Sequence, residues 1–510
     1  MQATVLTAGQ GSSEPGQVPA AQAGTPAPSP GASRWWKTAL AVLFVAYFFL
    51  ASWDTVKAHF SPDEMFAIWW YWHPPPMHLL VSQFTLWSGS LRPVGGLFYL
   101  PIYLVFGLNP VPYHVVLLLL LLAGAYLMYR FARGLGCADM PAAIVALIAC
   151  YHGGLGNLYY NSVFVFDVLC GVFYFGALAY YARIRSSGRL LSWGQTAAFL
   201  GLYLCALNSK EMAVTLPVIL LAYEWLLQPP PRLPWKNLVK WLLGPGRVLC
   251  LTGLMNLLFI YGRSFGPDGL MNGPSAAYKP VLSLERIVDF QERYIGDIFY
   301  HLPRFGWLAT LLIWLAVTFF VWRRKRPLLR FCWVYVLVTP LPIEFLIGRD
   351  QACLYVCLAG WAVLAATLFT DLLTSAAPLV VAAEPLLRRL ELGRVRTLLA
   401  ALCMIVFALG NWSFKQTDVA AAMPALGPQT FEVLAEFRKV NPSVPPGSTV
   451  VFLDDPWPNA LFDMAFIAEL WFRDRKTRVL LNQVSHLPPE EMAKAGAVFT
   501  WQNGKLIRVR

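Results

Sequence analysis

Residues 59–73, HFSPDEMFAIWWYWH, place two adjacent acids, Asp63 and Glu64, between a hydrophobic segment and a run of aromatic residues. Ser61, Pro62 and the two acids have the order of a helix start: an N-cap residue, a proline at the first helical position and carboxylates that complement the helix dipole. A carboxylate that such a cap holds rigid is also suited to act as a general base on an incoming hydroxyl. The two interpretations are compatible, and this stretch alone does not choose between them.

The composition around this stretch indicates a membrane protein. Of the 510 residues, 57% are hydrophobic and 13% are charged, whereas about a quarter of the residues of a soluble domain are charged. The net charge of +12 comes from basic residues in short loops between apolar runs, so we expect no nucleic-acid partner. The nine cysteines lie in or beside apolar segments, which indicates buried small side chains and no disulfide framework.

The apolar runs predict a polytopic α-helical membrane protein. Residues 1–33 are too poor in large side chains to build a core, so we expect a disordered cytoplasmic tail. A transmembrane helix needs about 20 apolar residues. The domain at 34–413 then holds eleven predicted spans, at 38–53, 111–132, 139–152, 162–182, 194–209, 212–227, 243–262, 305–322, 330–347, 353–371 and 397–413.

The distribution of Lys and Arg predicts the orientation of these spans. Basic residues are concentrated in alternate short loops, among them Arg323–Arg326, and cytoplasmic loops are the ones that carry such an excess. The N-terminus is therefore expected in the cytoplasm. Asp63, the long loop at 263–304 and the C-terminal tail are expected on the outer face.

The last hundred residues differ from the rest. We expect 414–510 to form a small extracytoplasmic α/β domain, because helical and strand patterns alternate there without long apolar runs. Its predicted elements are a helix at Thr430–Val440, a strand at Ser448–Leu453, a helix at Ala460–Phe472, a strand at Thr477–Leu481 and a hairpin at Val498–Val509 that turns at Asn503-Gly504.

Ionisable residues at membrane depth are the remaining candidates for chemistry, since the sequence has no glycine-rich phosphate loop, no zinc-ligand spacing and no nucleophile elbow. Asp167 lies near the outward end of the span 162–182 and is either an interfacial acid bonded to a neighbouring helix or a site residue. Lys210 and Glu211 lie in a tight outward hairpin. They form either a solvated surface pair or a place where Lys210 holds a lipid phosphate.

Residues 283–300, SLERIVDFQERYIGDIFY, have helical spacing of apolar residues, which predicts an amphipathic helix in the membrane interface. Such a helix is usually structural, but it could also cover a cavity into which Arg293 or Arg304 reaches. The histidines, His73 among them, are scattered. We therefore expect neither a metal site nor a cofactor.

The order of several motifs resembles a known family. Asp63-Glu64 is followed by Leu91-Arg92-Pro93, Phe106–Pro110, an acid at Asp167 and the motif Lys210–Pro217. This order is similar to the membrane half of the transmembrane O-mannosyltransferases with tetratricopeptide repeats. Those proteins, like the protein O-mannosyltransferases, are GT-C glycosyltransferases, and the resemblance covers about residues 38–370.

The resemblance implies that the chain is a GT-C-like enzyme of the bacterial inner membrane. It implies transfer of a sugar, such as a mannosyl or other hexosyl group, from a polyprenyl-phosphate donor to a protein, lipid or glycan acceptor, with inversion at the anomeric carbon. Asp63 is then the general base, with Glu64 as its orienting or acceptor-contacting neighbour and Asp167 as a second acid. Lys210 and Arg349 would contact the donor phosphate.

Glu211, Arg293 and His73 are candidates for cavity or acceptor contacts. The chain departs from the family pattern at Gln351–Tyr355, where relatives carry an arginine before a Leu-Tyr pair and this chain has Arg349 upstream. It also has no tetratricopeptide repeats. Two other functions remain open from the sequence: a transporter or flippase of polyprenyl-linked sugars, and a non-catalytic membrane anchor for the C-terminal domain.

Overall fold

The computed structural model describes residues 32–89, 92–229, 235–266, 279–300, 305–349, 351–383, 391–419, 427–457 and 463–510. The chain divides into two compact units, Met1–Leu43 and Phe44–Arg510. In the first unit the described residues form the beginning of helix α1 (Ala32–Ser52). The predicted disordered tail at 1–33 lies almost wholly outside the described residues.

Eight helical segments in the described part of the chain are long and apolar enough to cross a membrane. They are Lys37–Lys57, Pro110–Gly134, Ser162–Arg185, Arg247–Phe265, Trp307–Arg324, Pro327–Glu344, Gln351–Ala382 and Leu392–Val419. Shorter apolar helices are Gly95–Phe106, Asp139–Cys150 and Trp193–Leu207. The prediction of a polytopic helical membrane protein is therefore confirmed.

Each of the eleven predicted spans lies on a helix, although not every one is long enough to cross a bilayer alone. The span predicted at 212–227 is the shorter helix α10 (Leu216–Leu226). The sequence did not predict helix α4 (Gly95–Phe106), which contains Pro101. Its 12 residues fall short of the about 20 that a spanning segment needs, so a search for spans passes over it.

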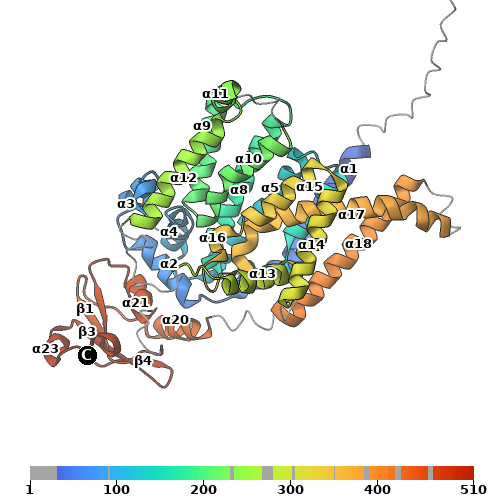
Figure 1. Ribbon diagram of the computed structural model, residues 1–510. Helices are drawn as coiled ribbons and strands as arrows, with labels where there is room; N and C mark the ends of the chain where they lie inside the picture. Colours follow the sequence, from blue (N-terminus) through green and yellow to red (C-terminus); the bar gives the residue numbers. More distant parts are fainter. Residues whose placement is uncertain are drawn as a thin grey trace, which may run out of the picture. The chain divides into compact units, whose positions relative to one another are not determined.

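The elements before the C-terminal domain are as follows, with η marking single turns of other helix types (Figure 1). They are α1 (Ala32–Ser52), η1 (Trp53–Lys57), α2 (Pro62–Trp72), α3 (Pro76–Ser82), η2 (Leu86–Ser88), α4 (Gly95–Phe106), α5 (Pro110–Gly134), α6 (Asp139–Cys150), η3 (Gly153–Leu155), α7 (Asn157–Tyr160), η4 (Ser162–Phe164), α8 (Val165–Arg185), α9 (Trp193–Leu207), η5 (Glu211–Thr215), α10 (Leu216–Leu226), α11 (Trp235–Leu243), α12 (Arg247–Phe265), α13 (Leu284–Ile298), α14 (Trp307–Arg324), α15 (Pro327–Val338), α16 (Leu341–Glu344), η7 (Gln351–Leu354), α17 (Tyr355–Ala383), α18 (Leu392–Phe414) and η9 (Lys415–Val419).

Helix α8 lies at the centre of the helical part, where it packs against α5, α9 and α17. Buried ion pairs lie near both of its ends. At one end Lys210 Nζ contacts Asp167 Oδ2 at 2.8 Å, and at the other Arg185 Nε contacts Glu224 Oε1 at 2.7 Å. Breaking either pair would leave a buried charge without its partner, which is costly. The two pairs therefore favour the packing of α8 against the segments that carry Lys210 and Glu224.

The amphipathic helix predicted at 283–300 is α13, Leu284–Ile298. Ser283 caps it, because its side chain accepts a hydrogen bond from Arg286 N. Phe290, Tyr294 and Ile295 are fully buried, so one face of the helix packs against the helical part and the prediction of an amphipathic helix is confirmed. Arg304 lies outside the described residues.

The C-terminal domain contains a four-stranded sheet with the order β2-β1-β3-β4. Strand β1 (Thr449–Phe452) pairs in parallel with β2 (Arg478–Leu481) and β3 (Ala497–Gln502), while β4 (Lys505–Arg508) is antiparallel to β3. These strands carry the red end of the colour scale in Figure 1. The helices of the domain are α20 (Pro428–Val440), α21 (Asp463–Phe472), α22 (Asn482–Ser485) and α23 (Pro489–Lys494).

The predicted combination of helices and a small sheet at the C-terminus is thus confirmed, and the hairpin turns where the sequence predicted. Asn503 and Gly504 have φ values of 50° and 74°, the left-handed geometry that a two-residue hairpin of type I′ requires. The first residues of the helix predicted at Ala460–Phe472 lie outside the described residues, which begin again at Asp463.

Candidate functional site

The acids Asp63 and Glu64 occupy the first turn of α2 with opposite exposure: Asp63 is exposed and Glu64 is completely buried. Glu64 Oε2 accepts a hydrogen bond from the backbone N of Ser61 at 2.6 Å, which is the carboxylate half of a capping box. Its Oε1 accepts from the backbone N of Ser162 at 2.8 Å and from the Ser162 hydroxyl. The predicted helix start is therefore present.

Glu64 is thereby a link between two elements. Burial raises the pKa of the Glu64 carboxyl, and the hydrogen bonds from Ser162 and Ser61 offset part of that rise. Both oxygens are occupied, and Ser162 lies five residues before Asp167. Glu64 therefore holds the start of α2 next to the start of α8 and leaves Asp63 as the exposed acid of the first turn of α2.

Asp167 and Lys210 pair directly with one another. Lys210 Nζ lies 2.8 Å from Asp167 Oδ2, with side chains that are 9% and 2% exposed. Cys353 Sγ lies 4.0 Å from the same Nζ. The second oxygen, Asp167 Oδ1, is buried and has no hydrogen-bond partner among the described residues. This pair therefore still has an acceptor atom that a ligand or a water molecule could satisfy.

Glu211, the neighbour of Lys210, binds two arginines. Arg92 Nη2 lies 3.1 Å from Glu211 Oε2, and Arg263 Nη2 contacts Glu211 Oε1. Burial raises the pKa of Glu211, but the charges of Arg92, Arg263 and Lys210 lower it further, so the pKa lies well below its usual value. Glu211 is therefore ionised at neutral pH and binds two arginines, and its side chain is 30% exposed.

Arg92 has an unusual backbone, with a φ of 46°. Such a conformation costs a residue with a side chain about 1–3 kcal/mol. The Tyr71 hydroxyl contacts this backbone, because it donates a hydrogen bond to Arg92 O at 2.7 Å. The Arg92 guanidinium lies 5.2 Å from the centre of the Phe166 ring. Because Tyr71 belongs to α2 and Phe166 precedes Asp167, Arg92 connects the helix of Asp63 to the ion pair.

We call the set formed by Arg92, Asp167, Lys210, Glu211, Arg263 and Arg349 the cationic cluster. Arg349 belongs to it because its charge acts on Cys353, which contacts Lys210. Counted over its described members, the cluster has four cations and two carboxylates, and thus a surplus of positive charge. Tyr71, which contacts it, lies eight residues after Asp63, or about 12 Å along the helix axis.

Sequence reasoning missed Arg92 and Arg263 as site residues. A signal for Arg92 was available, since it lies in the motif Leu91-Arg92-Pro93 that carried part of the resemblance. Nothing local distinguishes Arg263, which lies in the last turn of α12. Only the fold brings it to Glu211.

Two other candidates lie apart from the cluster. Arg293 Nε contacts Asp289 Oδ1 at 3.3 Å along the same helix, α13. His73 Nδ1 lies 3.7 Å from Glu469 Oε2, a residue of the C-terminal domain. Among the described residues no group of three or more His, Cys, Asp or Glu side chains could hold a metal ion.

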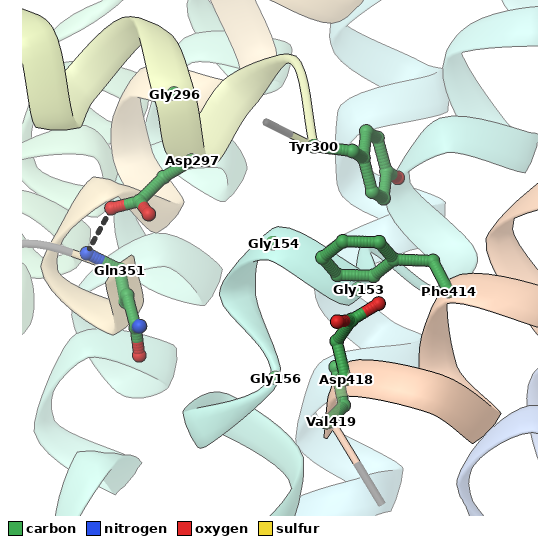
Figure 2. Close-up of a pocket in the computed structure, with 10 residues that line it drawn as sticks. All are labelled: Gly153, Gly154, Gly156, Gly296, Asp297, Tyr300, Gln351, Phe414, Asp418 and Val419. Atoms are coloured by element: carbon green, nitrogen blue, oxygen red, sulfur yellow. Dashed lines mark hydrogen bonds between the residues drawn. The ribbon is translucent and has the colours of Figure 1, made fainter. Parts of the chain in front are cut away.

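A hollow lies between α13, η3, η7 and η9, and Figure 2 shows its lining. It has a volume of about 110 Å³ and contains the carboxyl groups of Asp297 and Asp418. Glycines form its wall because a Cβ on Gly154 would come within 2.0 Å of Asp297 O. The lining includes none of the site residues predicted from the sequence.

Comparisons by sequence found nothing: no known protein family and no curated protein matches the chain. Solved structures do match its fold. The crystal structure of ArnT from Cupriavidus metallidurans in the apo state aligns with a TM-score of 0.50 and 12% identity, over 92% of this chain and 93% of that chain. The structure of the same protein bound to undecaprenyl phosphate aligns with a TM-score of 0.49 and 13% identity, over 92% of each chain.

ArnT is a GT-C glycosyltransferase. At 12% identity the likeness concerns the fold, and it extends over nearly the whole of both chains. It agrees with the eight apolar helices and with the small sheet at the C-terminus. The chain is therefore a membrane protein whose fold is similar to that of ArnT.

Proposed function

We propose that this protein is an inverting glycosyltransferase that moves a sugar, such as a mannosyl or other hexosyl group, from a polyprenyl-phosphate donor to an acceptor. The reaction takes place on the extracytoplasmic face of a bacterial inner membrane. The observation that carries the proposal is the cationic cluster beside the helix of an exposed carboxylate, in a chain with a GT-C fold.

The surplus positive charge of the cluster suits a phosphate. Arg92 and Arg263 present planar guanidinium groups, and Lys210 adds an ammonium point charge. In the transfer, the bond between the anomeric carbon and the phosphate oxygen breaks and its electron pair leaves with the phosphate. Fixed cations in a partly buried site stabilise that developing charge without reorganisation.

Asp63 is the proposed general base. Its carboxylate is exposed while that of Glu64 is occupied by three hydrogen bonds, so Asp63 is the member of the pair that can reach an acceptor. It would take the proton of the acceptor hydroxyl as the acceptor oxygen attacks the anomeric carbon. Asp167 acts through Lys210, which it holds in place.

The test is transfer of labelled sugar from polyprenyl-phosphate sugars in proteoliposomes, with wild type compared with Asp63→Asn. We expect the variant to lose activity by a factor on the order of 10²–10⁴, the usual contribution of a general base. Asp139→Asn is the matched control, because Asp139 also lies in the first turn of a helix but pairs with Arg133.

Three outcomes separate the alternatives. Full activity of Asp63→Asn would remove Asp63 as the base while keeping the transferase. Movement of the labelled donor across the bilayer without transfer would support a transporter of polyprenyl-linked sugars. Neither movement nor transfer with any donor would leave the chain as a membrane anchor for its C-terminal domain.

A further inference from the structure

Helix α21 of the C-terminal domain packs against α2, the helix of Asp63. The two run in parallel, as contacts at successive levels show. The Phe66 and Phe466 rings lie 5.4 Å apart between centroids, Trp69 Nε1 donates to Glu469 Oε2 at 2.6 Å, and Arg475 Nε donates to Trp72 O at 2.9 Å.

This parallel arrangement brings two acids to the same end of the interface. Asp63 precedes Phe66 by three residues, and Asp463 precedes Phe466 by three residues. Residues three apart share one face of a helix, and each acid lies about 4.5 Å along the axis from its ring. The first turns of both helices therefore carry their carboxylates next to the same pair of rings.

Asp463 is mostly buried but makes few hydrogen bonds with its surroundings. The residue is only 5% exposed. Among the described residues, its carboxyl receives a hydrogen bond from no residue other than Asp463 itself, through its own backbone N. The carboxyl therefore has acceptor capacity that a ligand or a water molecule could use.

We propose that Asp463 is the second carboxyl of the transfer site, and that Asp63 and Asp463 together take up the proton of the acceptor hydroxyl. This inference rests on the proposed glycosyl transfer. The C-terminal domain then contributes a residue to the reaction. No sequence motif pointed to Asp463.

The O–H bond of the acceptor breaks and the new bond forms between the acceptor oxygen and the anomeric carbon. The bond from that carbon to the donor phosphate breaks, and its electron pair leaves on the polyprenyl phosphate. Asp63 receives the proton, and Asp463 holds it in the pair until it passes to water.

The charges around Asp463 are consistent with this role. Burial, then the charge of Asp63, then that of Asp455 raise the pKa of Asp463 to about 6. The other charged groups along the interface, Glu469, His73 and Arg475, lie six residues or more farther along the chain than the acid of their own segment. A carboxyl that titrates near pH 6 can accept and release a proton near neutrality, and two interacting carboxyls titrate as a pair.

The first experiment is the pH profile of kcat in proteoliposomes for wild type and Asp463→Asn. We expect wild-type activity to fall as the pH drops through about 6, because a pair that already holds a proton accepts another poorly. In Asp463→Asn we expect kcat at pH 7.5 to fall about tenfold and the acid limb to move toward about pH 4, the range of an isolated carboxyl. Asp463→Glu should restore part of the rate.

Glu469→Gln is the control for docking, because Glu469 lies on the same helix and contacts Trp69 and His73 across the same interface. We expect it to keep the wild-type acid limb. An Asp463→Asn protein with the wild-type rate and profile would overturn the inference and leave the proposed function intact. The same would follow if Glu469→Gln moved the acid limb equally.

The second experiment needs no activity: thermal unfolding of wild type, Asp463→Asn, Asp63→Asn and the double variant between pH 4 and 7.5. Because folding raises the pKa of Asp463, its contribution to stability is present below about pH 4 and is lost as the pH rises through 6. Asp463→Asn should therefore raise Tm at pH 7.5 but not at pH 4, and this gain should shrink in the Asp63→Asn background. If Asp463→Asn raised Tm equally with and without Asp63→Asn, the two carboxyls would not interact. That result would overturn the inference even if no sugar transfer is ever observed.

Discussion

At the scale of single residues, Asp63 and Glu64 are neighbours in sequence with opposite tasks. Glu64→Ala removes three hydrogen bonds that join α2 to Ser61 and Ser162. At about 1 kcal/mol net for each bond, we expect a loss of roughly 2–4 kcal/mol and a lower Tm in detergent. Asp63→Asn should not lower the Tm near pH 7, since Asp63 is exposed.

A Glu64→Gln variant is the matched control for shape. The oxygen of the glutamine amide can still accept a hydrogen bond, but its NH2 group faces protein donors and cannot. The Tm of this variant should therefore lie between those of Glu64→Ala and wild type. If Glu64→Ala unfolded at the wild-type temperature, the link between α2 and α8 would not depend on this carboxylate.

At the scale of elements, the ion pair of Lys210 and Asp167 joins the start of η5 to α8. Lys210→Met leaves the carboxylate of Asp167 buried without its cation, and breaking such a pair costs about 3–5 kcal/mol. The double variant Lys210→Met/Asp167→Asn removes both charges, so we expect most of the stability to return. Its affinity for a polyprenyl phosphate should stay low, because the cluster has lost a cation.

Thermal unfolding and donor binding, measured on both variants, separate the two roles of this pair. Recovery of stability together with donor binding in the double variant would make Lys210 purely structural. Lys210→Arg is the control that keeps the charge but changes its geometry, and it should bind the donor better than the double variant does.

At the scale of the whole molecule, the proposal requires Asp63, the cationic cluster and the C-terminal domain to share the outer face. The loops rich in Lys and Arg predict this orientation. A reporter that works only outside the cytoplasm should therefore be active when fused after Phe414. Fused after Arg324, the last residue of α14, where the basic segment before α15 lies, it should be silent. A silent fusion after Phe414 would place the domain in the cytoplasm and remove extracytoplasmic transfer.

Much of the fold followed from sequence because it depends on local physics. Apolar length determines which segments form spanning helices, so each of the eleven predicted spans lies on a helix. Ser61-Pro62-Asp63-Glu64 starts a helix and Asn503-Gly504 turns a hairpin for similarly local reasons. Helix α4 was not predicted because its 12 residues are fewer than the about 20 that a spanning helix needs.

The sequence by itself determined that the chain is a helical membrane protein with a small α/β domain, and it singled out Asp63, Asp167 and Lys210. Only the tertiary structure decided how these residues are used. It buried Glu64 in a cap, paired Asp167 with Lys210, and brought Arg92 and Arg263 to Glu211. It also set α21 beside α2, so that Asp463 shares an end with Asp63 although 400 residues separate them in the chain. Helix propensity and hydrophobic length act over a few turns, whereas partners of charged groups are chosen by packing between distant segments, which no local pattern records.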